Sequence, residues 1–144
     1  MSVVRWWLAW LAAVVVATLL GSVVQTQFNL ARITGLDVTV PGSVRIETTL
    51  FDLAHFAPIW AVIMALAMII AMPIAGLLAR RWQEFRGMLY PLAGFVAACT
   101  ALLVMNAMLP VTPVGAARTW AGIVSMALPG ALAGWTHWLI LQRQ

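Results

Sequence analysis

The chain has 144 residues, of which 64% are hydrophobic and only 8% are charged. Soluble globular domains carry roughly 25% charged residues, so this composition excludes a domain that folds in water. Eight arginines and four acidic residues give a net charge of +4, and the chain contains no lysine. In so apolar a chain we expect the arginines at the ends of membrane helices, and we expect no binding to nucleic acid.

Four apolar runs divide the chain, and each has the roughly 20 residues needed to cross a hydrocarbon core about 30 Å thick. They predict transmembrane helices over about residues 5–30, 53–79, 88–109 and 117–141. The first run is too long for the core of a signal peptide and lacks a small-x-small cleavage site, so we expect it to be retained. We therefore predict an all-α integral membrane protein, a four-transmembrane-helix bundle that forms a single membrane domain over residues 1–144.

The clearest polar stripe lies in the second half of the first helix. Thr18, Ser22, Gln25, Thr26 and Asn29 recur at intervals of three or four residues, apart from the adjacent pair at 25 and 26. This spacing places them on one face of a helix. We expect that face to meet other polar groups of the bundle, because polar side chains in lipid need partners.

The link between the first two helices, LDVTVPGSVRIETTL, alternates apolar and polar residues around a Pro-Gly pair. A three-residue loop over 41–43 sets Val40 opposite Val44 and keeps the apolar side chains on one face. The alternation predicts a short extracytoplasmic β-hairpin over about residues 35–50. Because two strands alone are marginal in water, we expect the hairpin to cap the outer mouth of the bundle.

The distribution of arginines predicts the orientation of the chain. Five fall on the side of the two termini and three on the other, and the side with more arginine faces the cytoplasm. We expect a multi-pass protein of a bacterial inner membrane with both termini in the cytoplasm. The first group is Arg5, Arg80, Arg81, Arg86 and Arg143, and the second is Arg32, Arg45 and Arg118.

Small residues indicate where helices approach each other closely. An alanine recurs at every fourth position from Ala67 to Ala79 in the second helix, and Gly130 and Gly134 stand in GxxxG spacing in the fourth. In lipid, packing of small residues replaces the hydrophobic effect as the driving force for helix association. The glycine pair serves either packing inside the chain or contact between copies, and the spacing leaves both open.

The histidines, the cysteine and the acidic residues, which in other proteins bind metals or carry protons, are poorly placed here for either role. His55 and His137 are expected at opposite ends of the bundle, as interfacial histidines that cannot clasp one haem. Cys99 stands alone, so it forms no internal disulfide and no metal cluster. All four acidic residues fall in links or at a helix boundary, which argues against a proton-coupled transporter. We expect no metal and no cofactor.

A set of polar residues is expected near one depth, in the outer third of the bundle, and we call it the polar patch. One interpretation is that these side chains hold the helices together by hydrogen bonds; the other is a small cavity for an amphipathic molecule such as a lipid headgroup or a quinone. The candidate ligand-binding residues are Ser22, Gln25, Thr26, Asn29, Asp52, His55 and Asn106.

Three functional hypotheses follow. The leading one is a non-catalytic inner-membrane protein that acts through protein contacts, as a subunit, an assembly factor or a homo-oligomer. The alternative is a binder or carrier of a lipid, a quinone or another hydrophobic ligand through the polar patch. The weakest is a membrane-embedded enzyme that uses His55 and Asp52, which are three residues apart. Ser22 or Thr26 is expected at a similar depth, but the sequence does not show that the first two helices bring them together, so a catalytic role is the least favoured.

Overall fold

The structure is a computed structural model that describes residues 2–142. Over this range it contains helices and no strand. The elements are α1 (Val3–Thr34), α2 (Gly42–Arg81), the 3-10 helix η1 (Gln83–Phe85), α3 (Arg86–Met108), the 3-10 helix η2 (Gly115–Arg118) and α4 (Trp120–Gln142). Four of the described helices are long and apolar enough to span a membrane, which confirms the predicted multi-pass, four-helix fold. Arg143, which contributed to the predicted orientation, lies outside the described residues.

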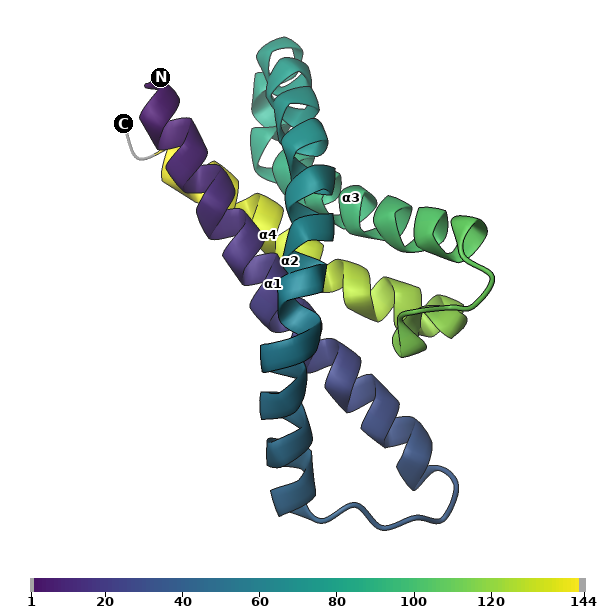
Figure 1. The fold of residues 1–144 in the computed structure, drawn as a ribbon. Coiled ribbons are helices and arrows are strands. Elements are labelled where there is room, and N and C mark those ends of the chain that lie inside the picture. Colours follow the sequence, from purple (N-terminus) through teal and green to yellow (C-terminus); the bar gives the residue numbers. More distant parts are fainter. Residues whose placement is uncertain (1, 143–144) are drawn as a thin grey trace.

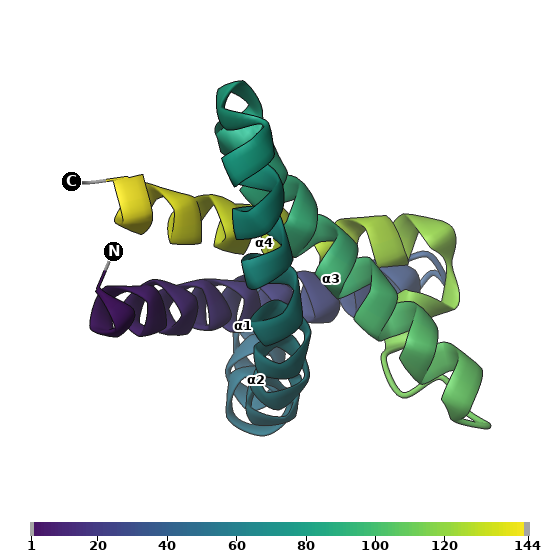
Figure 2. The same cartoon turned by 90° about the horizontal axis from the view of Figure 1, so that it is seen from above.

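The helices α1 and α4 run side by side in opposite directions, and α3 packs on the other side of α4 (Figures 1 and 2). Helix α2 crosses this pair and contacts both α1 and α3. The first turns of α1 lie near the last turns of α4 (Figure 1), and the Nε atom of Arg5 donates a hydrogen bond of 2.9 Å to the carbonyl of Ile140.

The interior is built from small residues of α1 and large flexible residues of α2. Trp60 and the three methionines that follow it at intervals of four residues, Met64, Met68 and Met72, are buried. Trp60 lies directly on Gly21 of α1, where a Cβ would overlap the indole nitrogen. The opposite face of α2 carries large apolar side chains that are exposed, as expected where lipid and not water is the solvent.

The closest helix contact joins α3 and α4 and depends on glycines. A Cβ on Gly94 would overlap the carbonyl oxygen of Gly130, and one on Gly134 would overlap the carbonyl oxygen of Tyr90. The two backbones therefore touch without intervening side chains. The GxxxG pair of α4 thus packs against α3 of the same chain, which is one of the two uses that its spacing left open.

The predicted β-hairpin over residues 35–50 is wrong. Gly42 to Leu50 form the first turns of α2, with Pro41 as the N-terminal cap residue, and the range 35–41 is a link without strand. Asp37, which the hairpin placed in a strand, has a φ angle of 60°, a value that extended strands do not adopt. Proline suits the beginning of a helix as well as a turn, because its missing N–H is not needed there.

The contacts of this segment explain why the helix forms. Arg45, Thr49 and Asp52 make hydrogen bonds to α1 side chains. Their spacing of four and three residues is that of one helix face, whereas a strand would need a spacing of two. The hydroxyl of Thr49 also donates to the carbonyl of Arg45, a bond available only in a helix. An extension of α2 that packs on α1 replaces two marginal strands.

This extension makes α2 far longer than a membrane requires. Its 40 residues span about 60 Å, roughly twice the hydrocarbon thickness. The range 42–52 holds Arg45, Glu47 and Asp52, and the last ten residues of α1 are also mainly polar. We call residues 25–52 the helical arm and the part of the bundle that carries it the arm end. The arm forms the lower part of the molecule in Figure 1.

Replacing Gly94 with alanine tests the contact between α3 and α4. We expect the free energy of unfolding in detergent to fall by about 1–3 kcal/mol, because the added methyl group separates the two backbones. Gly42→Ala is the matched control, since a Cβ there meets nothing within 4 Å. Equal unfolding midpoints for the two variants would show that the backbones are not in contact.

Candidate functional site

One side of the predicted polar stripe of α1 holds the link between α3 and α4. The Oε1 atom of Gln25 accepts a hydrogen bond of 3.2 Å from the backbone N–H of Ala116. One turn further, Asn29 lies so close to Gly115 that a Cβ there would be 2.6 Å from its Oδ1 atom. Arg32 donates to the carbonyl of Gly115 over 3.4 Å. These three side chains form one helix face that lies along η2.

Helix α3 also contacts η2. The amide nitrogen of Asn106 donates a hydrogen bond of 2.9 Å to the carbonyl of Ala117. Gln25 and Asn106 thus bind consecutive residues of η2 from two sides, so they lie at the same level of the bundle. Both alanines of η2 are buried. The polar side chains therefore fix a buried link between α1 and α3.

The second side of the stripe meets α2. The hydroxyl of Thr26 lies 2.6 Å from the Oδ2 atom of Asp52 and 3.0 Å from the carbonyl of Ser22. A hydroxyl has a single hydrogen to donate, and the shorter distance together with the negative charge favours Asp52. Thr26 is fully buried and Asp52 is half-buried. This bond joins α1 to α2 where the arm leaves the membrane-spanning part.

Three arm residues outside the predicted patch continue this connection. The amide nitrogen of Gln27 donates a hydrogen bond of 3.1 Å to the hydroxyl of Thr49, and its amide oxygen accepts one of 3.3 Å from the guanidinium of Arg45. Sequence reasoning missed them because it assigned the range 35–50 to a hairpin. The signal that could have identified Arg45 and Thr49 is their helical spacing with Asp52. Beside them lies a hollow of about 390 Å³, lined by Gln27, Gly42, Arg45, Ile46, Thr49 and Leu50.

His55, the remaining member of the patch, points away from it. The side chain is exposed, and its ring stacks on Phe51 with the ring centres 4.0 Å apart. Its Nδ1 atom is 2.9 Å from the carbonyl of Phe51, and within residues 2–142 no hydrogen bond joins it to Asp52. No group of three potential metal ligands occurs in the described part of the chain.

His137 is not the interfacial residue that the sequence suggested. It is fully buried in the bundle, between Tyr90 and Trp6, at ring-centre distances of 5.4 and 5.8 Å. Neither ring nitrogen has a hydrogen-bond partner among the described residues. His137 follows Gly130 and Gly134 by seven and three residues, so it shares the face of α4 that packs inside the chain. That spacing is the signal that could have placed it.

Most of the polar patch is thus paired with the protein itself, as the bonds of Gln25, Thr26, Asp52 and Asn106 show. Some buried polar atoms have no hydrogen-bond partner within residues 2–142: besides the nitrogens of His137, these are Trp10 Nε1, Thr18 Oγ1, Ser22 Oγ, Trp60 Nε1 and Asn106 Oδ1. The arrangement fastens α2, α3 and η2 to α1 at the arm end. Comparison with protein-family models, curated proteins and solved structures finds no match to this chain.

Replacing Gln25 with leucine tests the attachment of η2. We expect the backbone amide of Ala116 to exchange its hydrogen faster, by about tenfold, because its acceptor is lost and the link opens locally. Hydrogen exchange measured by mass spectrometry reports this rate. Gln27→Leu is the control, because Gln27 bonds to α2 and should leave the amide of Ala116 unchanged.

A double-mutant cycle tests the bond between α1 and α2. For Thr26→Val combined with Asp52→Ala we expect a coupling energy of about 1–2 kcal/mol in the free energy of unfolding, because the hydroxyl donates to a charged group. Thr136→Val is the control partner, since its hydroxyl donates within its own helix, to Leu132. Coupling no larger for Thr26 than for Thr136 would mean that the contact adds no stability.

Proposed function

We propose that this chain is a non-catalytic integral membrane protein that acts through protein contacts at its helical arm, as a subunit, an assembly factor or a homo-oligomer. The observation that carries the proposal is a group of large apolar side chains exposed on an arm that is too polar to lie in hydrocarbon. We place the chain in a bacterial inner membrane. The arginine distribution supports an orientation with both termini in the cytoplasm, which puts the arm outside.

The exposed fractions of these side chains are large. They reach 76% for Leu36, 64% for Ile46, 61% for Leu50 and 59% for Phe51. Elsewhere in the chain such exposure is expected, because lipid covers it, but the arm holds charged residues at 45, 47 and 52. Covering one such side chain contributes about 1.5–3 kcal/mol. Apolar side chains gathered in one water-exposed segment are typical of a protein-interaction surface.

The shape of the arm supports the same role. Ile46 and Leu50 are four residues apart and form the apolar edge of the 390 Å³ hollow. Gln27, Arg45 and Thr49 supply its polar side and hydrogen-bond to one another. The hollow thus has one apolar edge and one edge of polar groups fixed by hydrogen bonds. Such a hollow suits a partner side chain that has an apolar and a polar part.

The other two hypotheses have less support. A lipid or quinone in the polar patch would compete for Gln25, Thr26 and Asn106, which already hydrogen-bond to the protein. An enzyme that uses His55 and Asp52 would need the two side chains to meet, whereas the imidazole lies on Phe51 and the carboxylate on Thr26. The contact role requires neither group to be released.

The test places a photo-crosslinking amino acid at Leu50 in intact membranes. We expect a protein adduct, with twice the mass of the chain for a homo-oligomer and another defined mass for a different partner. Val62 is the matched control, because it is equally exposed, at 61%, but lies in the apolar part of α2. The second expectation is that Ile46→Ser reduces the adduct at position 50. A folded chain that gives no protein adduct at 50, or the same adduct at both positions, would contradict the proposal.

A further inference from the structure

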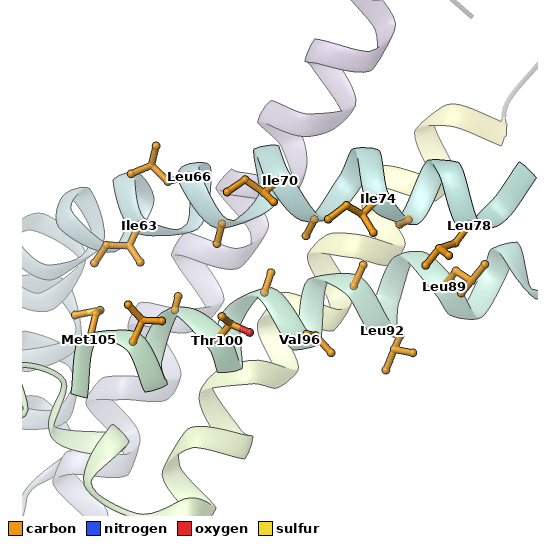
Figure 3. Close-up of a pocket in the computed structure, with 17 residues that line it drawn as sticks. Ile63, Leu66, Ile70, Ile74, Leu78, Leu89, Leu92, Val96, Thr100 and Met105 are labelled. Carbon is orange, nitrogen blue, oxygen red and sulfur yellow. The ribbon is translucent and has the colours of Figure 1, made fainter. Parts of the chain in front are cut away.

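A long apolar groove runs between α2 and α3 on the membrane-spanning part of the bundle. Its volume is about 650 Å³, within the range of roughly 300–1,000 Å³ typical of small-molecule sites. Thr100 is the one lining residue with a polar side chain. Figure 3 shows the two walls, which include Ile70, Ile74 and Leu78 of α2 and Leu89, Leu92 and Val96 of α3. On α2 the groove extends from Ile63 to Leu78, about 22 Å.

Arginines stand at the end of the groove nearest the α2–α3 link. The lining residues of α2 recur every three or four positions up to Leu78, and Arg81 is the next position of that face. On α3 the lining begins at Leu89, and Arg86 precedes it by three residues on the same face. Arg86 reaches across to α2, where its Nε atom lies 3.3 Å from the carbonyl of Ala79. Both arginines are exposed.

The surroundings of this mouth are those of a membrane interface. Trp82 and Phe85 lie between the two arginines in sequence and are about half exposed, at 51% and 53%. Aromatic side chains favour the level of lipid headgroups. Arg80 adds a third exposed positive charge, and Glu84 is the one acidic residue of the link. The mouth is therefore cationic, and its aromatic side chains are typical of the level of lipid headgroups.

We propose that the α2–α3 groove is a binding site for one anionic phospholipid, with an acyl chain along the groove and the phosphate at Arg81 and Arg86. The groove alone would accept any apolar chain, but a cationic mouth on the same two helix faces selects a negatively charged headgroup. Guanidinium groups donate paired hydrogen bonds to the phosphate of any phospholipid. The choline cation of a zwitterionic headgroup is repelled by the exposed Arg80, Arg81 and Arg86, whereas an anionic headgroup brings no positive charge. The proposal concerns a different end of the molecule from the arm and does not depend on the arm's role.

The test uses the full chain in nanodiscs that contain equal amounts of phosphatidylglycerol and phosphatidylcholine, followed by native mass spectrometry. We expect one retained phosphatidylglycerol per chain. Each of Arg81→Gln and Arg86→Gln should weaken its retention about fivefold, the effect of roughly one arginine near an anionic surface. Arg118→Gln is the control, because Arg118 is also exposed but lies on η2 at the arm end.

Filling the groove tests the acyl chain separately. Ala71→Phe should abolish retention, because Ala71 lines the groove. Val62→Phe is its control, since Val62 is exposed to lipid on α2 but does not line the groove. Melting curves establish that each variant is folded, and the exposed arginine variants test the site even if Ala71→Phe does not fold.

Three results would overturn the proposal. Equal retention of both lipids, unchanged in the arginine variants, would show that the headgroup is not recognised. A dimer or a partner complex that Ala71→Phe disrupts, with no retained lipid, would make the groove a surface for a protein helix. No retained lipid and no complex would show that the groove holds only exchanging bulk lipid.

Discussion

The structure depends on the fact that hydrocarbon offers no hydrogen bonds, so polar groups must find partners in the protein or stand beyond the lipid. Helix α1 meets much of this constraint at the arm end, although Thr18 Oγ1 and Ser22 Oγ of the same stripe have no hydrogen-bond partner among the described residues. One side of its polar stripe binds η2 through Gln25 and Arg32, and the other binds α2 through Thr26 and Gln27. A single helix thereby fixes the position of its two neighbours. The residues that a ligand site in the polar patch would need therefore largely bond to the protein itself.

The same constraint explains why α3 packs tightly on α4 but leaves an open groove beside α2. Where backbones touch, as at Gly94 and Gly130, neither lipid nor side chains separate α3 from α4. Between α2 and α3 the facing residues leave a gap, and only apolar surface lines most of it. Apolar atoms in lipid lose little when they are not covered by protein, so the fold tolerates an open groove there. An open polar groove at that depth would be far more costly.

Much of this could be predicted from the sequence, and the failures have physical causes. Length and composition were enough to predict four spanning helices, and the recurrence of polar residues from Thr18 to Asn29 was enough to place their face inside. The hairpin prediction was wrong because alternation of polar and apolar residues over a short range also fits a helix whose polar residues recur at 45, 49 and 52. Pro41 suited both interpretations. His137 was misplaced because distance from a helix end says nothing about which neighbour a side chain meets.

The unbroken course of α2 has a mechanical consequence. The helix begins in the arm beside Ile46 and Leu50, passes through the bundle and ends at Arg81. A rod of about 60 Å that tilts around its midpoint moves its two tips in opposite directions. Any tilt of α2 would therefore change the position of Ile46 and Leu50 and the width of the gap to α3 together.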